Sequence, residues 1–394
     1  MRACLVLALA LLLALPSSAA AAAALPPARC VSAASCSHNG VCGEDGVCAC
    51  SAAWRTNASA PFGCSLLNLL SPARGAGLHS LDGGRNTSSW GGSALRDERS
   101  GLYHMFASQF TNHCGLETWT ANSHVVRATA AAADGAYARV ADAAGGEVFP
   151  VFSHEPNAVR DPASGEWALF FTLKAPSGRP PCNCSASGAH AGPCDGAGEG
   201  PTVVSWAPAP EGPWSPPLLL LDMGGSQSDT NLAPVILRNG SLVGIWRTWD
   251  AGSWPHLVTA AHWKNASSYV FDPAPLFPGL GGQGTEDPAL YLDASGVFHA
   301  LFHNMVPRFG PDVAGGHAFS EDGVSWTYTG VAYNASGLYT DGSAFSFSRR
   351  ERPHPIMAAD GVTIVALSTG VVYSDDPVAV HGSPSFTFVQ PVAH

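Results

Sequence analysis

Two neighbouring carboxylates, Glu286 and Asp287, stand directly before an apolar stretch in "GTEDPALYLDASGVFHALFH", residues 284–303. The stretch predicts two β-strands joined by the turn "DASG", because apolar and aromatic residues flank a Gly-containing turn. Adjacent carboxyl groups can perform acid–base chemistry, since each raises the cost of ionising the other and one can keep its proton near neutral pH. The question is whether other parts of the chain bring ionisable residues to the same place.

The same unit, an apolar strand, a polar turn with Gly and a second apolar strand, recurs along the chain. Its five copies begin at Ser93, Asn157, Pro234, Pro288 and Pro355. Each copy is followed by a third candidate strand, such as "SHVVRATAA" or "GVVYSDDP", and some by a fourth, such as "LLLLDM" and "YVFDPAPLF". Three to four antiparallel strands repeated five times predict an all-β fold, a five-bladed β-propeller over residues 66–394.

Two other architectures were weighed against the propeller. A large β-sandwich or two-sheet jelly roll is the alternative, whereas the lack of a convincing helical period disfavours a parallel α/β fold. The Ala-rich stretch 128–144 is interpreted as a hairpin turning at Asp134 and Gly135 rather than as a helix. Either the C-terminal "SFTFVQPV" or the segment 66–70 is expected to close the ring.

In a propeller the innermost strand of each blade begins near the axis, so the residues just before it line the central funnel. Across the five copies these positions hold Trp90, His154, Glu155, Asp229, Asn231, Glu286, Asp287, Arg349, Arg350, Glu351, Arg352 and His354. Charged residues that converge from separate blades are costly unless they pair with each other or bind something. The sequence therefore predicts a functional site on the axis.

A structural network is the competing interpretation of this ring. The arginines of "RRERP" could form ion pairs with Glu155 or Asp287 and simply plug the axis. Four further residues lie at the ends of second strands: Arg247, Trp249, His303 and Asn304. The sequence leaves open whether they reach the rim of the funnel or pack in the core. Asp161 of "VRDP" aligns with turn residues of other copies, Asp97 and Asp293, so it is interpreted as a turn residue.

The N-terminal segment 1–24 predicts a secretory signal peptide, because one Arg precedes an apolar run and a series of small residues. No second apolar run is long enough for a membrane span. Six N-x-S/T sequons predict a secreted glycoprotein: Asn57, Asn86, Asn183, Asn239, Asn265 and Asn334. The net charge of −11 and the absence of a basic block make nucleic acid an unlikely partner class.

Eleven cysteines are present, and the ten outside the signal peptide suit an oxidising compartment. Six of them lie in residues 30–64, where their spacing is C-x5-C-x5-C-x5-C-x-C-x13-C, with "HNGVC" at the third Cys. This stretch resembles an EGF-like module, placed at residues 25–65. The resemblance implies the pairs Cys30–Cys42, Cys36–Cys48 and Cys50–Cys64, while spacing alone leaves fifteen pairings open.

The other four cysteines are Cys114, Cys182, Cys184 and Cys194. One of Cys182 and Cys184 is expected to pair with Cys194 and the other with Cys114. The Gly/Pro-rich stretch around them would then form a disulfide-pinned loop in the second blade.

From about residue 75 onward, the "[ED]-P/N-A" strand starts, the "DGxSW" hairpins and the acidic ring resemble the five-bladed propeller glycosidases. This group includes glycoside hydrolase family 43, the arabinanases and xylosidases, and the invertase and levansucrase families. The resemblance implies three carboxylates on the first strands of different blades: an Asp on blade 1, an Asp on blade 2 and a Glu on a later blade. The chain departs from that plan, because Trp90-Gly91-Gly92 stands where the blade-1 Asp is expected.

The resulting hypothesis is a secreted glycoside hydrolase that acts on an extracellular or cell-wall glycan. Glu286 would be the proton donor, and Asp287 or Glu155 the second carboxylate. Trp90 would stack on a sugar, Arg350 or Arg352 would hold an acidic or hydroxyl group, and further binding contacts would come from His154, Asp229, Asn231 and Glu351.

A catalytically inactive sugar-binding or adhesion protein is the alternative function, with the EGF-like module contacting another extracellular protein. No cofactor is predicted. An axial Ca²⁺ or Na⁺ would suit carboxylate and carbonyl oxygens, although no ligand motif indicates one.

Overall fold

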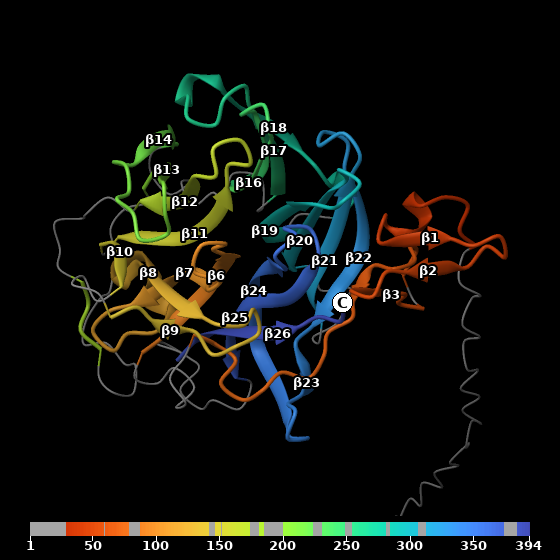
Figure 1. The fold of residues 1–394 in the computed structure, drawn as a ribbon, viewed down its shortest axis with the longest axis horizontal. Coiled ribbons are helices and arrows are strands. Elements are labelled where there is room, and N and C mark those ends of the chain that lie inside the picture. Colours follow the sequence, from red (N-terminus) through yellow and green to blue (C-terminus); the bar gives the residue numbers. More distant parts are fainter. Residues whose placement is uncertain are drawn as a thin grey trace, which may run out of the picture.

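A computed structural model describes residues 29–58, 60–78, 87–141, 146–150, 152–173, 181–184, 200–223, 231–248, 254–280, 284–305, 313–373 and 384–394. Five antiparallel sheets surround a common axis, which confirms the all-β five-bladed propeller (Figure 1). Within these ranges, helix is limited to α1 (Trp119–Asn122) and the 3₁₀ turns η1 (Ala34–Cys36), η2 (Leu116–Thr118), η4 (Ala266–Ser268) and η5 (Pro278–Leu280). No helix in the described ranges has the length and apolar character that crossing a membrane requires.

Each blade runs outward from the strand nearest the axis. Blade 1 contains β6 (Ser89–Arg96), β7 (Tyr103–Phe110), β8 (Ser123–Ala130) and β10 (Glu147–Phe149), with β9 (Ala138–Arg139) also on β8. Blade 2 contains β11 (Ser153–Arg160), β12 (Trp167–Leu173), β13 (Thr202–Ala207) and β14 (Leu218–Leu221). Blade 3 contains β15 (Ala233–Ile236), β16 (Leu242–Thr248), β17 (Trp254–Ala260) and β18 (Tyr269–Pro275).

Blades 4 and 5 follow the same plan. Blade 4 contains β19 (Thr285–Leu292), β20 (Phe298–Asn304), β21 (Val313–Ser320) and β22 (Thr327–Asn334). Blade 5 contains β24 (Ala344–Met357), β25 (Ile364–Tyr373), β26 (Phe386–Pro391) and β5 (Gly77–Leu78), with β23 (Ser336–Leu338) on the other side of β24. The five repeats and the outer strands β14 and β18 lie where the sequence predicted them.

The C-terminal stretch "SFTFVQPV" takes part in closing the ring, as predicted, but its partner is residues 77–78. Residues 77–78, which precede blade 1 in the chain, form the outermost strand of blade 5 through Leu78–Thr387 and Gly77–Phe388 pairing. The C-terminal stretch is β26, the third strand of blade 5, so the prediction that "GVVYSDDP" forms this strand is wrong. Residues 370–373 instead continue the ten-residue strand β25. Joining the two ends of the propeller in one sheet removes an open edge.

The hairpin turns have the chemistry that their sequences predict. The carboxylates of Asp97, Asp161 and Asp293 accept backbone N–H bonds within their own turns, from Ser100, Ala163 and Ser295, at 3.1, 2.9 and 2.8 Å. Asp161 is therefore a turn residue, as expected. The Ala-rich stretch also forms the predicted hairpin, because β8 pairs with β9 around Gly135.

The small N-terminal region contains β1 (Gly40–Cys42), β2 (Cys48–Cys50), β3 (Trp54–Arg55) and β4 (Leu66–Leu67). Three disulfides hold it, Cys30–Cys42, Cys36–Cys48 and Cys50–Cys64, as the resemblance implied. Residues 66–67 pair with β3, whereas residues 68–70 bond to the end of β26 and the residues after it: Leu69 bridges Val392, and the Leu70 N–H donates to the Pro391 carbonyl. A region this small buries little apolar surface by itself, which explains its dependence on cross-links.

This disulfide-rich region packs against blade 4 (Figure 1). The Trp54 ring lies 4.8 Å from the His317 ring, and the His38 Nε2 atom lies 2.9 Å from a Glu321 carboxylate oxygen. Cys36, Cys64 and Leu67 share one buried cluster with Ala332, Tyr333 and other propeller residues. The region is thus continuous with the propeller core.

The remaining cysteines follow the expected scheme as far as the described residues show it. Cys114 is bonded to Cys184, which connects blade 1 to the loop of blade 2. Cys182 is also disulfide-bonded, and Cys194 lies outside the described residues. Of the sequon residues, Asn183, Asn239, Asn265 and Asn334 are exposed, Asn57 is half-buried and Asn86 lies outside the described residues.

Replacing Trp54 with Ala should destabilise the propeller, not only the disulfide-rich region. Trp54 is 5% exposed and packs in the shared cluster. Truncating a buried Trp costs about 3–5 kcal/mol of unfolding free energy, which denaturant unfolding of the whole chain would measure. Val41→Ala, an exposed change in the same region, is the control. An unchanged unfolding free energy for Trp54→Ala would mean that the two parts are independent.

Candidate active site at the propeller axis

Five residues occupy equivalent positions where the five innermost strands begin. Gly91, Glu155, Asn231, Asp287 and Arg352 all have left-handed backbone conformations, with φ of 61°, 60°, 43°, 49° and 55°. Four of them coincide with a register irregularity, or β-bulge, between the first and second strands of the blade. The bulge turns one residue of each strand out of the regular alternation, and these residues form a group that we call the floor ring.

The floor ring carries conformational strain. The left-handed conformation is costly for any residue with a Cβ atom, about 1–2 kcal/mol each, and four of the five have one. Such strain persists only where the surrounding structure enforces it, and it is concentrated at functional sites. Pro156, Pro288 and Pro353 follow three of these residues in the sequence. The "EP", "DP" and "RP" pairs are thus the sequence signal of the ring.

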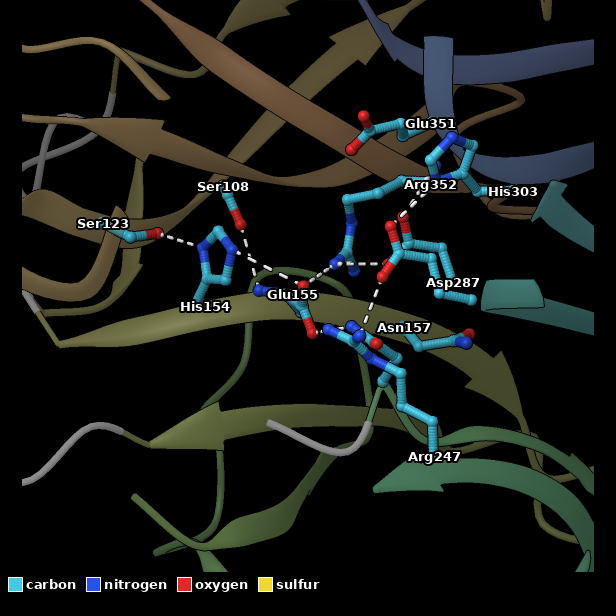
Figure 2. A network of polar contacts seen from close by, with 12 residues as sticks. Ser108, Ser123, His154, Glu155, Asn157, Arg247, Asp287, His303, Glu351 and Arg352 are labelled. Carbon is cyan, nitrogen blue, oxygen red and sulfur yellow. Dashed lines mark hydrogen bonds and ion pairs between the residues drawn. The ribbon is translucent and has the colours of Figure 1, made fainter. Parts of the chain in front are cut away.

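Arg352 is the centre of the floor ring, as Figure 2 shows. Its guanidinium Nη1 forms an ion pair with Glu155 and lies 3.5 Å from Asp287 Oδ1. Its backbone N–H donates to Asp287 Oδ2 at 3.2 Å, and the Asn231 side-chain amide donates to Glu155. The alternative that the sequence left open, an arginine paired with Glu155 and Asp287, is therefore what the structure contains.

Gly91 explains how Arg352 fits on the axis. A Cβ atom at Gly91 would lie 2.9–3.0 Å from Cβ, Cδ and Nε of Arg352. Real Cβ atoms do not approach other atoms that closely, so the arginine stem occupies the space that a side chain on blade 1 would take. The position where the resemblance expects an Asp thus holds a Gly, and an arginine from blade 5 fills the room.

His154 and two serines fix the geometry of Glu155 (Figure 2). Ser108 Oγ accepts the Glu155 backbone N–H at 3.0 Å. His154 Nδ1 is 2.6 Å from Ser123 Oγ, and its Nε2 is 3.6 Å from Glu155 Oε1. His154 is buried, so it acts on the neighbouring carboxylate within the protein.

A second group of charged residues lies one residue earlier on blades 4 and 5, and we call it the rim cluster. Glu286 accepts hydrogen bonds from Arg247 Nη1 at 2.7 Å and shares one with His303 Nδ1 at 2.8 Å. Glu351 accepts two from Arg349, at 2.7 and 3.1 Å. One potential ligand atom of each of Glu286, Asp287, His303 and Glu351 lies within 4.8 Å of the others.

Two side chains of the rim cluster are more exposed than those of the floor ring, whereas that of Glu351 is 9% exposed and comparably buried. The side chains of His303 and Glu286 are 17% and 12% exposed, compared with 6–7% for Glu155, Asp287 and Arg352. Among the described residues, His303 is bonded through Nδ1 to Glu286, and none bonds its Nε2 atom. His303 Nε2 is thus the atom of the rim cluster that a ligand can contact most readily.

Burial and charge move the pKa values of two of these groups in informative directions. Burial raises the pKa of Asp287 to about 6, assisted by Glu286 and Glu351 and opposed by Arg352 and Arg247. Burial would lower the pKa of His303, but Glu351 and Glu286 outweigh it and raise this pKa to about 9. His303 is therefore a cation at neutral pH, held between carboxylates.

The rim cluster also has the ligand types of a cation site. Three arginines, Arg247, Arg349 and Arg352, already supply positive charge to its carboxylates. We therefore interpret it as an ion-pair network and assign no metal to it.

The predicted sugar platform and one predicted arginine do not face the axis. Trp90 is buried among Phe110, Leu116 and Val372, and the Arg349 guanidinium lies 5.3 Å from its ring. Arg350 points into blade 5, where it donates to the Asn334 carbonyl and to Gln390, both at 2.9 Å. Adjacent residues in a strand face opposite sides, so Arg350 is directed away from the side on which its neighbour Glu351 reaches the rim cluster.

The structure brings together Glu155, Asn231, Asp287 and Arg352 in the floor ring, and Glu286 and Glu351 in the rim cluster. His154 supports the first group. Asp229 and Trp249 lie outside the described residues. The sequence left open whether His303 and Arg247 lie at the rim or in the core, and the structure places both in the rim cluster. No sequence pattern indicated the ion pair of Arg349 with Glu351 or the roles of Ser108 and Ser123.

With the geometry established, the chain can be compared with known proteins. No protein-family model matches the sequence, and no curated protein sequence matches it. The solved structures that share the fold include the following three. The catalytic domain of a family 62 α-L-arabinofuranosidase from Coprinopsis cinerea matches with a TM-score of 0.57 and 12% identity, over 83% of this chain and 97% of that one.

The other two matches are of the same kind. Zg3597, a family 117 glycoside hydrolase from the marine bacterium Zobellia galactanivorans, has a TM-score of 0.52 and 12% identity, over 83% of this chain and 91% of that one. The α-L-arabinofuranosidase PaAbf62A from Podospora anserina, in complex with cellotriose, has 0.50 and 10%, over 84% and 96%. At these identities the likeness establishes the fold, a five-bladed propeller with glycoside hydrolases as structural neighbours.

Replacing Arg352 with Gln should strongly destabilise the protein at neutral pH. Losing one partner of a buried ion pair typically costs about 3–5 kcal/mol of unfolding free energy, because Glu155 and Asp287 would stay buried without a counter-charge. Without the arginine both carboxyls bind protons more readily in the folded state, so the loss should shrink as the pH falls toward 4.5. Denaturant unfolding at pH 7.5 and 4.5 measures this.

Arg74→Gln, which removes an exposed ion pair with Asp341, is the matched control and should cost far less. A loss for Arg352→Gln that is equally small, or one that does not change with pH, would show that the floor ring is not held by this arginine.

The raised pKa of His303 predicts a loss of stability in alkali. The histidine titrates near 6.5 in the unfolded chain and near 9 in the folded protein. Its contribution is therefore complete below pH 6.5 and is lost as the pH rises through 9. His303→Gln should remove this part of the pH dependence, measured as the unfolding free energy between pH 6.5 and 9.5. His113→Asn, an exposed position, should leave the slope intact, whereas identical slopes in wild type and His303→Gln would contradict the assignment.

Proposed function

We propose that this chain is a secreted glycoside hydrolase that cleaves a glycosidic bond of an extracellular or cell-wall glycan at the rim cluster. The observation that carries the proposal is the close approach of Glu286, Glu351 and a protonated His303 at the reachable end of the axis. Glycosidic cleavage needs a proton donor at the leaving oxygen and a carboxylate at the anomeric carbon. The rim cluster offers both, and the shared fold with glycoside hydrolases supports this choice.

His303 is the proton donor in this proposal, in place of Glu286. Two cationic donors, Arg247 and His303, contact the Glu286 carboxylate and stabilise its charged form. Glu286 therefore acts as a positioning residue: it accepts the His303 Nδ1–H and directs Nε2 toward the ligand. A carboxylate that orients a catalytic imidazole in this way recurs in unrelated enzymes.

Glu351 is the second carboxylate. Arg349 donates two hydrogen bonds to it and fixes its position. Its nearest approach to the His303 ring nitrogen is no more than 4.8 Å. Carboxyl groups about 5–5.5 Å apart characterise enzymes that retain the anomeric configuration, and a wider gap of about 6.5–9.5 Å leaves room for the water of an inverting enzyme. These spacings refer to two carboxyl groups, whereas the donor here is a histidine, so retention is proposed by analogy with the closer pair.

The steps follow from these roles. A Glu351 oxygen forms a bond to the anomeric carbon as the glycosidic C–O bond breaks, and His303 Nε2 gives its proton to the leaving oxygen. Water then attacks the anomeric carbon, returns a proton to His303 and releases Glu351. Asp287 and Glu155 remain paired with Arg352 beneath the site, and their net negative charge favours the positively charged transition state.

Secretion and the EGF-like character of the N-terminal region belong to the same proposal. Four described disulfides fit an oxidising compartment. The spacing of the first six cysteines and their 1–3, 2–4, 5–6 pairing support an EGF-like module. Because one face of this region packs on blade 4, a protein partner would bind the opposite, outward face.

Glu351→Gln and His303→Gln should each lower turnover by at least about 100-fold, the usual contribution of one acid–base group. The assay measures new reducing ends on a panel of plant and algal polysaccharides, with products identified by mass spectrometry. Glu44→Gln, an exposed change in the N-terminal region, is the matched control. Unchanged turnover in both rim variants would overturn the proposed machinery.

A glycan-binding protein without catalysis is the second candidate. Its support is the floor ring, where Gly91 replaces the expected Asp and Arg352 forms ion pairs with both Glu155 and Asp287. Wild-type protein that binds a glycan from the panel but releases no product, with binding weakened by Glu351→Gln, would establish this function in place of hydrolysis.

A further inference from the structure

The axis has a second opening at the opposite end, where the innermost strands finish. A cavity of about 580 Å³ lies there, lined by the ends of the inner strands of all five blades. Its apolar wall includes Leu95, Val159, Ile236, Leu290 and Met357. Cavities of about 300–1,000 Å³ with mostly apolar walls and a few polar groups are typical of small-molecule sites.

Three arginines stand on this wall, one from each of blades 1 to 3. Arg96 and Arg160 are the last residues of β6 and β11, and Arg238 follows the end of β15 by two residues. Within the described part of the chain none of the three has an ion-pair partner. Arg160 lies over the Trp167 ring at 5.3 Å, and Arg238 is exposed. Their guanidinium groups therefore keep hydrogen-bond donors for a ligand.

The acids of the same hairpins are occupied by their own turns. Asp97 and Asp161 accept the turn N–H bonds described above, and Asp161 also accepts from the Trp263 indole at 3.3 Å. Asp360 accepts from the backbone of Val362 and from the Thr363 hydroxyl. These carboxylates offset charge near the cavity, but their oxygens are directed into the turns. Glu98, an exposed carboxylate, also lines the cavity, so the arginines are the charged hydrogen-bond donors that remain free to contact a bound molecule.

We propose that this cavity is a second binding site, for a small organic ligand that carries an oxyanion such as a carboxylate, sulfate or phosphate monoester. The planar guanidinium fork matches such anions and can bind them through two parallel hydrogen bonds. The apolar wall accommodates the body of the ligand. This site lies at the other end of the axis from the rim cluster and is independent of hydrolysis there.

The test measures equilibrium binding of three probes to the full chain by calorimetry: sodium sulfate, galactose 6-sulfate and uncharged galactose. Galactose 6-sulfate should bind most tightly, inorganic sulfate more weakly, and galactose not at this site. Arg238→Gln should weaken binding of galactose 6-sulfate about tenfold, the usual value of a charged hydrogen bond, and the triple change at Arg96, Arg160 and Arg238 should abolish it.

Two controls separate the site from general charge effects. Arg99→Gln removes an arginine in the same hairpin as Arg96 that pairs with Asp97 and does not line the cavity, so binding should persist. Glu351→Gln, at the rim cluster, should leave binding unchanged. Because Arg238 is exposed, its replacement should not impair folding. Equal affinity in wild type and Arg238→Gln, or equal affinity for galactose and galactose 6-sulfate, would show that the arginines are only solvated and would overturn the proposal.

Discussion

The buried contact of Arg352 with Glu155 and Asp287 is the constraint on which the rest of the axis depends. Five strand starts, four of them with a strained residue, converge on the propeller axis. Their carboxylates bring negative charge into a buried region. A single guanidinium from blade 5 contacts carboxylates from blades 2 and 4 at once and offsets part of their charge. Because a buried charge without a partner is so costly, the placement of these three blades and the absence of a side chain at Gly91 follow from the same contact.

This contact also determines where chemistry can occur. The floor ring occupies the positions at which the resemblance to propeller glycosidases places catalytic acids, yet its acids are committed to an arginine and an asparagine. The residues one position earlier, Glu286 and Glu351, approach His303, which is the most exposed member of the group. The reacting groups are therefore those of the rim cluster, one residue earlier on the inner strands. The floor ring supports them and contributes negative charge beneath the site.

Much of this organisation could be predicted from the sequence, for reasons that differ among its parts. The blades were predictable because strand and turn patterns repeat, and the turn carboxylates Asp97, Asp161 and Asp293 because their role is local. Side-chain direction was not. Arg350 and Arg352 look alike in "RRERP", but the bulge at Arg352 turns one toward the axis and the strand carries the other into the core. The burial of Trp90 was likewise not predictable from the sequence, because it depends on tertiary packing that includes Arg349 over its ring.

The central claim is that a rim carboxylate, rather than a floor-ring acid, attacks the sugar. The most direct measurement is covalent trapping with a panel of 2-deoxy-2-fluoroglycosyl fluorides, which arrest a retaining enzyme at its glycosyl ester, followed by peptide mapping. The account predicts an ester on Glu351. An ester on Glu155 or Asp287 would contradict it, because those carboxylates would then have to leave Arg352 to react.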